Sequence, residues 1–215
     1  MTIKCLAFDL DGTLLLDESK RMDPRTVDSI QRAMAQGMHV VIASGRDKNG
    51  CKFVYEPLGL ENGNHFLALV NGQVVYDFEN KEYDLDDVLT AEDGVKIQKV
   101  CKQFGVEGIF QCGYDFYSYI SSLNRVKKKV KNAILGEPDD YGLKDGKENR
   151  NFIDLPFEEI RLTQDINKVI MVHSPRFFEK NFEGIKAALS DYDVLLIGPD
   201  WLEIMPKHVN KASAL

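Results

Sequence analysis

The chain has 215 residues, of which 44% are hydrophobic and 28% charged, ordinary values for a soluble globular protein that exclude a fibrous or disordered class. Its formal net charge of -7 and its pI near 5.2 disfavour broad binding to nucleic acid, whose phosphates attract basic surfaces. Small phosphorylated molecules stay possible partners, because a local cluster of Arg, Lys and backbone N–H groups can bind a phosphate within an acidic protein.

The cysteines and the apolar runs predict the cellular setting. No CxxC pair occurs among the four cysteines, so we expect reduced thiols. The N-terminal apolar run is broken by Asp9 and Asp11 before it reaches the length of a signal peptide's hydrophobic region, and no run approaches a membrane span. We therefore expect a cytoplasmic protein with no membrane partner.

The first 45 residues read as a βαβ unit. Ile3–Phe8 is a short apolar run closed by an Asp/Gly turn, which predicts a buried strand. Pro24–Gln36 has apolar residues at helical spacing, with Asp23 as N-cap and Gly37 as stop. Met38–Ala43 is a second all-apolar run, which suits a parallel strand covered on both faces. Together these elements predict a parallel α/β sheet.

Beyond this unit the pattern changes. Phe66–Val70 and Val74–Phe78 flank Asn71-Gly72-Gln73 and predict a hairpin. Two stretches then follow the order helix, strand, strand, separated by a polar loop over 136–151 and a weakly defined stretch. The first comprises a helix over 91–104 and strands over 108–111 and 116–120, followed by a further helix over 123–135. After a strand over 168–173, the second comprises a helix over 177–189 and strands over 194–197 and 201–205.

These elements predict an α/β protein with a Rossmann-like parallel-sheet core and an inserted α+β domain. We place the core at residues 1–81, the inserted domain at 82–205 and the return to the core at 206–215. The two αββ stretches are alike in order without obvious identity in sequence.

The segment Phe8-Asp9-Leu10-Asp11-Gly12-Thr13-Leu14 indicates phosphoryl transfer. Asp9 stands at the end of a predicted strand, where open α/β sheets place their chemistry. It can attack phosphorus, while Asp11 can protonate the leaving oxygen and later activate water. Thr13 can hydrogen-bond across the turn and hold Asp11 in place.

Two further segments supply candidate phosphate ligands. Ser44 closes the second strand, so its hydroxyl should lie at the same sheet edge as Asp9. Gly45 permits close backbone approach, and Arg46 could clamp a phosphate or orient a carboxylate. Lys211 follows the last predicted strand, and on its own such a lysine is usually solvated. A basic stretch, which comprises Arg125, Lys127, Lys128, Lys129 and Lys131, reads as a solvated helix face.

These segments resemble the motifs of the haloacid dehalogenase (HAD) superfamily, and within it the Cof-like phosphatases with a type IIB cap. Residues 8–14 resemble the family's first motif, and Ala43-Ser44-Gly45-Arg46 resembles its second. The segment from Met205-Pro206-Lys207 through Asn210-Lys211 resembles its third motif, which carries a lysine. Val70-Asn71-Gly72 is similar to the segment that precedes the cap, and the αββ stretches resemble the cap itself.

The resemblance implies roles for these residues. Asp9 would be the nucleophile, Asp11 the acid/base and Lys211 the charge neutraliser. Mg²⁺ would be held by the Asp9 carboxylate and the Asp11 backbone carbonyl. The phosphate-binding set would comprise Thr13, Ser44, Gly45, Arg46 and Asn71.

Family members carry a fourth motif, Gly-Asp-x-x-Asn-Asp, after the lysine helix, whereas this sequence ends at Leu215. We expect the chain to be a fragment of a longer protein; a truncated product with weak Mg²⁺ binding is the alternative. The resemblance predicts a magnesium-dependent phosphatase that hydrolyses small phosphorylated metabolites, such as sugar phosphates, through an aspartyl phosphate. A phosphomutase of the same superfamily and a non-catalytic remnant that binds a phosphorylated ligand stay open, and the oligomeric state is not predicted.

Overall fold

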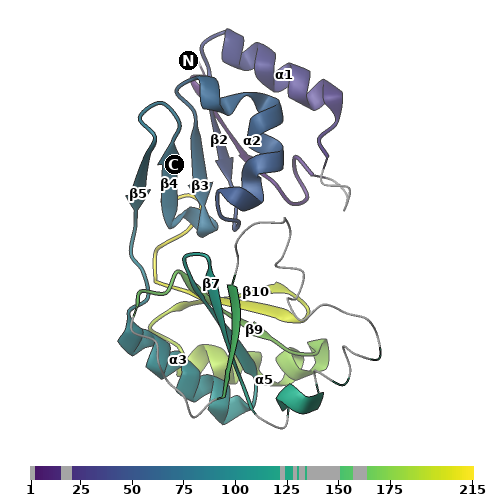
Figure 1. The fold of residues 1–215 in the computed structure, drawn as a ribbon, viewed down its shortest axis with the longest axis vertical. Helices are drawn as coiled ribbons and strands as arrows, with labels where there is room; N and C mark the ends of the chain where they lie inside the picture. Colours follow the sequence, from purple (N-terminus) through teal and green to yellow (C-terminus); the bar gives the residue numbers. More distant parts are fainter. Residues whose placement is uncertain are drawn as a thin grey trace. The chain divides into compact units, whose positions relative to one another are not determined.

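The computed structural model describes residues 3–15, 21–121, 124–127, 130, 134, 151–156 and 164–215. The chain divides into two compact units (Figure 1). Unit 1 comprises Met1–Asp87 and Val209–Leu215, and unit 2 comprises Val88–His208. Each unit has its own sheet and its own hydrophobic core.

Unit 1 is built on a five-stranded sheet with the order β1-β2-β3-β4-β5. The first three strands are parallel, and β4 and β5 extend the sheet in antiparallel fashion. The predicted βαβ unit and the hairpin are therefore confirmed. The strands are β1 (Cys5–Asp9), β2 (His39–Ala43), β3 (Phe66–Leu69), β4 (Val74–Asp77) and β5 (Glu82–Leu85).

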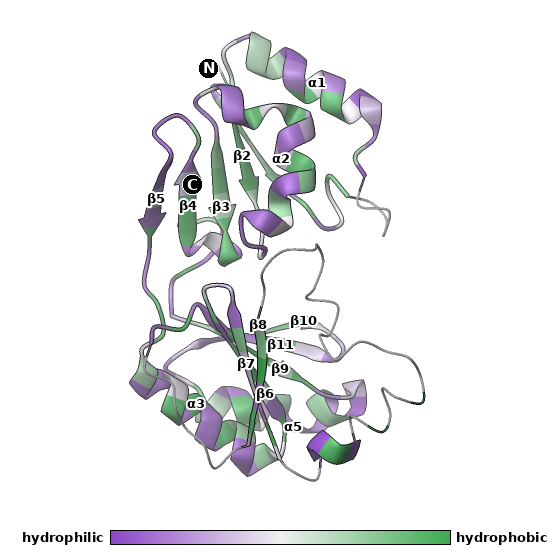
Figure 2. Cartoon of the chain, viewed as in Figure 1, coloured by the Kyte–Doolittle hydropathy of each residue, from purple (hydrophilic) through white to green (hydrophobic). Residues whose placement is uncertain are grey.

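Two helices cover one face of this sheet. The helix α1 (Pro24–Ala35) begins as predicted, because the Asp23 side chain accepts a hydrogen bond from the Arg25 N–H at 2.8 Å and Pro24 occupies the first turn. The helix α2 (Lys52–Leu58) was not predicted. Both helices contribute to one buried cluster with the strands, and in Figure 2 the middle strands β2 and β3 are mainly hydrophobic.

Short 3₁₀ turns connect the elements of unit 1. They are η1 (Asn49–Cys51), η2 (Leu60–Asn62) and η3 (Val70–Gly72).

The first strand departs from the prediction of a buried strand. Within the described residues β1 pairs only with β2, so it lies at an edge of the sheet. Cys5 and Ala7 are exposed, and Ile3 lies before the strand and is also exposed. The strand order accounts for this exposure, because a strand that is paired on one side leaves part of its surface uncovered, and an apolar run does not show where in the sheet a strand lies.

Unit 2 contains a six-stranded sheet with the order β10-β11-β9-β6-β7-β8. All neighbouring pairs are antiparallel except β7 and β8, which are parallel. The strands are β6 (Glu107–Cys112), β7 (Asp115–Ile120), β8 (Asn151–Pro156), β9 (Lys168–Val172), β10 (Asp193–Gly198) and β11 (Trp201–Met205).

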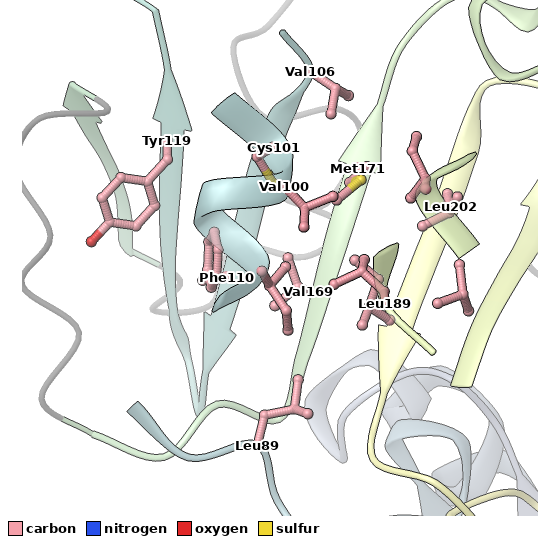
Figure 3. Close-up of a cluster of buried hydrophobic side chains, with 14 of the residues drawn as sticks. Leu89, Val100, Cys101, Val106, Phe110, Tyr119, Val169, Met171, Leu189 and Leu202 are labelled. Atoms are coloured by element: carbon pink, nitrogen blue, oxygen red, sulfur yellow. The ribbon is translucent and has the colours of Figure 1, made fainter. Parts of the chain in front are cut away.

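The helices α3 (Ala91–Phe104) and α5 (Pro175–Ala188) pack on this sheet around one hydrophobic cluster. Figure 3 shows Val100 and Cys101 of the α3 helix beside the strand residues Phe110, Val169 and Met171. The α3 helix begins with a capping box, in which Thr90 and Asp93 satisfy each other's backbone N–H groups. The two predicted αββ stretches thus fold onto one sheet.

Some sequence predictions differ from the structure or lie outside it. The strand β8 falls in the stretch that we left without an assigned element. Of the helix predicted over 123–135, residues 124–127, 130 and 134 are described and helical. Of the loop predicted over 136–151, residues 136–150 lie outside the described residues, and Asn151 begins the β8 strand instead. Unit 1 extends to Asp87 because β5 pairs with β4, whereas we placed the boundary after residue 81.

None of the helices in the described ranges combines the length and the apolarity that a bilayer crossing requires.

Candidate functional site

Three parallel strands end together at one edge of the unit 1 sheet. Asp9 at the end of β1 lies beside Ala43 at the end of β2, and Ala43 lies beside Ala68 of β3. The carboxyl edge of a parallel sheet is where open α/β folds place ligands. Segments that carry polar and charged side chains follow each of these strands, and the site is built from them.

Asp9 is paired with Lys211, 202 residues further along the chain. The Lys211 ammonium donates to Asp9 Oδ1 at 2.7 Å, and the Leu10 backbone N–H donates to the same oxygen at 2.8 Å. Both side chains are partly exposed. The structure therefore brings together the residues that the sequence proposed as nucleophile and charge neutraliser.

The turn that carries Lys211 is fixed by its neighbour Asn210. The Asn210 side-chain oxygen accepts hydrogen bonds from the backbone N–H groups of Ala212 at 2.9 Å and Ser213 at 3.2 Å. This turn lies directly against Gly72. Gly72 has φ +99°, and a Cβ at this position would overlap the backbone carbonyl of Asn210. The turn after β3 and the turn that presents Lys211 are therefore in close contact.

Asp11 is held by Arg46 through two hydrogen bonds. The guanidinium reaches Asp11 Oδ1 at 2.9 Å through its terminal nitrogen and Oδ2 at 3.3 Å through Nε. The expected contact from Thr13 is not formed. Within the described residues the Thr13 side chain donates no hydrogen bond to Asp11, and the Thr13 backbone N–H donates to the Leu10 carbonyl. Thr13 is exposed, and Arg46 orients Asp11 instead.

Ser44 lies at the expected edge, but it is only 1% exposed. Its hydroxyl oxygen accepts a hydrogen bond from the Arg46 backbone N–H at 3.2 Å and is a hydrogen-bond partner of the Cys51 thiol. Burial raises the pKa of Cys51 to about 12, so this thiol stays protonated. Ser44 thus supports the backbone that presents Arg46.

The segment after β3 is strained at the same edge. Val70, Asn71 and Gly72 all have positive φ, an unusual conformation for a β-branched residue such as Val70. The Asn71 N–H donates to the Ser44 carbonyl at 3.0 Å. A Cβ on Gly45 would lie 2.7 Å from the Asn71 side-chain oxygen, so a larger residue at this position would displace the Asn71 side chain. The structure places Asn71 at this edge of the sheet, as expected, and adds a packing role for Gly72, which the sequence indicated only as part of the turn.

The fit of a magnesium ion to these residues is incomplete. Asp9 and Asp11 are the acidic residues of the first motif, and each already has a cationic partner. Among the described residues, no group of three or more His, Cys, Asp or Glu side chains could hold a metal. Mg²⁺ prefers six oxygen ligands in octahedral geometry, which one carboxylate and one carbonyl do not supply.

Comparison with known proteins identifies the family. A family model described as haloacid dehalogenase-like hydrolase matches residues 6–215. The chain belongs to this family. The family resemblance that the motifs predicted is thus confirmed, and the fold is that of a HAD-like hydrolase.

A curated relative of this HAD-like hydrolase covers its whole length. The protein named "Putative phosphatase M6_Spy0533" from Streptococcus pyogenes serotype M6 is 29% identical over 224 residues, which span 100% of this chain and 74% of the relative. Family membership and relatives of this kind establish the chain as a hydrolase of the phosphatase class.

Solved structures agree with this assignment of fold. A haloacid dehalogenase-like hydrolase from Bacteroides thetaiotaomicron superposes with a TM-score of 0.73 at 22% identity, covering 99% of this chain and 74% of that one. The HAD subclass IIB sugar phosphatase BT4131 gives a TM-score of 0.70 at 19% identity, covering 98% and 73%. Both likenesses concern the fold alone.

Proposed function

We propose that this HAD-like hydrolase cleaves small phosphorylated metabolites, with Asp9 as the nucleophile and an aspartyl phosphate as intermediate. The Lys211–Asp9 contact at the carboxyl edge of the unit 1 sheet supports this proposal most strongly. A carboxylate held by an ammonium beside the site of phosphate binding can attack phosphorus while the ammonium offsets the added negative charge.

The hydrogen bonds of Asp9 indicate which oxygen attacks. Oδ1 accepts from both Lys211 and the Leu10 N–H, so we assign the attack to Oδ2. The new bond joins Oδ2 to phosphorus, and the bond from phosphorus to the leaving oxygen breaks. Asp11, which is paired with Arg46 in the structure, takes up a proton from solvent once Arg46 moves to the phosphate and gives that proton to the leaving oxygen. Water deprotonated by Asp11 then attacks phosphorus, which releases inorganic phosphate and restores Asp9.

Arg46 connects binding to this chemistry. It holds both oxygens of Asp11 in the structure, and a phosphate dianion competes for the same guanidinium. Transfer of Arg46 from Asp11 to the phosphate would leave Asp11 beside the leaving oxygen. We keep Ser44, Gly45 and Asn71 in the proposed phosphate-binding region as the residues that shape its backbone. Thr13 stays in the proposal as an exposed residue of the turn that carries Asp11.

Magnesium dependence, the substrate class and the cell compartment belong to this proposal as well. When bound, Mg²⁺ would neutralise charge on the phosphate, and Asp9 with the Asp11 carbonyl would supply part of its ligand set.

Sugar phosphates are the proposed substrates, since a structural neighbour is named a sugar phosphatase. Unit 2 would act as the cap that selects among them. The four free cysteines suit a reducing, cytoplasmic setting.

The test is phosphate release from a panel of phosphomonoesters, with and without Mg²⁺. We expect turnover that needs Mg²⁺ and is lost in Asp9→Asn, a variant that keeps the shape of the side chain. Turnover that survives in Asp9→Asn would overturn the assignment of the nucleophile.

A further inference from the structure

Lys48 lies two residues after Arg46 and reaches an aromatic cluster. Its ammonium nitrogen is 3.4 Å from the centre of the Tyr76 ring and 5.8 Å from the ring centres of Phe78 and Tyr83. All three distances are within the range of about 6 Å in which a cation is attracted to an aromatic face. Neither the motifs nor the family comparison assigns a role to this lysine.

The three rings form a fixed acceptor for the cation. Tyr76 contacts Phe78 edge-on with ring centres 5.1 Å apart, and Tyr83 with ring centres 4.6 Å apart. Tyr76 and Phe78 are buried, whereas Tyr83 on β5 is half exposed. In the described part of the chain, Lys48 forms no ion pair with a carboxylate. Its ammonium instead contacts the faces of the aromatic rings.

This contact completes the anchoring of the loop that carries Arg46, which connects β2 to η1. The first half of the loop is fixed by main-chain bonds: the Val70 N–H donates to the Arg46 carbonyl and the Asn71 N–H to the Ser44 carbonyl, both at 3.0 Å. The second half has a local bond from the Gly50 N–H to Asp47 Oδ1 at 2.6 Å. Lys48 adds a side-chain contact from this half to the distant strands β4 and β5.

We infer that Lys48 is a positioning residue, which holds the Arg46 loop by its contact with Tyr76, Phe78 and Tyr83 and so keeps the guanidinium ready for the substrate phosphate. The inference rests on the proposed function of Arg46 at the phosphate. A loop that is already in place spares the substrate the cost of ordering it, so the gain is expressed in substrate binding.

The first test is steady-state kinetics of Lys48→Met, which keeps the length of the side chain and removes its charge. We expect kcat/KM to fall by about threefold to thirtyfold, the range that corresponds to a cation–aromatic contact, with most of the change in KM. Lys48→Arg should restore most of the loss, because arginine also stacks on rings. Lys52→Met is the matched control at a neighbouring lysine and should stay close to wild type.

A second readout does not depend on activity. Hydrogen exchange of the Val70 and Asn71 amides reports whether the loop is held, and it should quicken in Lys48→Met but not in Lys52→Met. Tyr83→Leu, at a half-exposed position, should produce the same change and add little to Lys48→Met in the double variant. Unchanged exchange in Lys48→Met would overturn the positioning role even if wild type is an active phosphatase. Faster exchange in a protein without phosphatase activity would instead overturn the proposed function while keeping the loop contact.

Discussion

At the scale of single residues, each carboxylate of the first motif is paired with a cation from a distant part of the chain. Lys211 holds Asp9, and Arg46 holds Asp11. The two pairs differ in geometry, since the ammonium contacts one oxygen of Asp9 whereas the guanidinium spans both oxygens of Asp11. This difference suits a nucleophile with one oxygen left for attack and an acid that is released when phosphate binds.

Replacement of Lys211 by Met should lower kcat/KM by about a hundredfold to a thousandfold, because the loss removes positive charge where negative charge develops in the transition state. Steady-state hydrolysis of the best phosphomonoester measures the effect. Lys207→Met, at an exposed lysine four positions earlier, is the control and should behave as wild type. Equal losses in the two variants would contradict the specific role of Lys211.

The cysteines should differ sharply in reactivity. Burial raises the pKa of Cys51 and Cys101 to about 12 and that of Cys112 to about 11, whereas Cys5 is exposed. The reactive thiolate is scarce below a thiol's pKa, so these three groups should stay unmodified by a disulfide reagent from pH 7 to about pH 9 in the folded protein. Mass spectrometry of the labelled chain should find one modified cysteine, Cys5. Labelling of Cys51 before unfolding would contradict its burial.

At the scale of elements, the sequence was sufficient where periodicity and caps were strong, as in α1 with its Asp23 cap and in the hairpin of β3 and β4. It failed for α2, which is only seven residues long and contains Pro57, and for β5, whose residues are all exposed. It also failed for β8, which pairs in parallel with β7 and ends in a proline. Such elements depend on tertiary pairing, which local pattern does not encode.

The same limit applies to the site. The shared carboxyl edge of parallel strands placed Asp9 and Ser44 together, whereas Lys211 was assigned to the site only through the family resemblance. The identity of the carboxylate that Arg46 orients and the contact of Lys48 with Tyr76 depend on loop geometry, and they emerged only from the structure.

Gly72→Ala tests the contact between the turn after β3 and the turn that presents Lys211. The added Cβ meets the Asn210 carbonyl in a left-handed backbone conformation, so the free energy of unfolding should fall by about 3 kcal/mol or more. Gly37→Ala is a matched control, since Gly37 also has positive φ but has open space around its Cβ, and it should cost about 1–2 kcal/mol. Denaturant unfolding measures both. A Gly72→Ala loss no larger than that of Gly37→Ala would contradict the close approach.

At the scale of the whole molecule, the chain has two compact units with separate hydrophobic cores. The unit 2 cluster drawn in part in Figure 3 also includes the fully buried Phe178 of α5, whereas the residues of the proposed active site lie in unit 1. Stability and chemistry should therefore be separable by mutation.

Phe178→Ala should lower the stability of unit 2 by about 3–5 kcal/mol, because it removes a large side chain from a packed core. Native-state hydrogen exchange, resolved by peptide, should show the loss in α3, β9 and α5, with β1 to β4 of unit 1 close to wild type. A uniform loss across both units would contradict their independence.

The most direct test of the account is whether Asp9 carries the phosphoryl group during turnover. The protein should be mixed with its best phosphomonoester and Mg²⁺, quenched in acid within the first turnover, and digested for mass spectrometry. We predict that the peptide containing Asp9 gains the mass of one phosphoryl group, and that Asp9→Asn gains none and releases no phosphate. Full turnover without this labelled peptide, together with activity in Asp9→Asn, would contradict the aspartyl-phosphate mechanism.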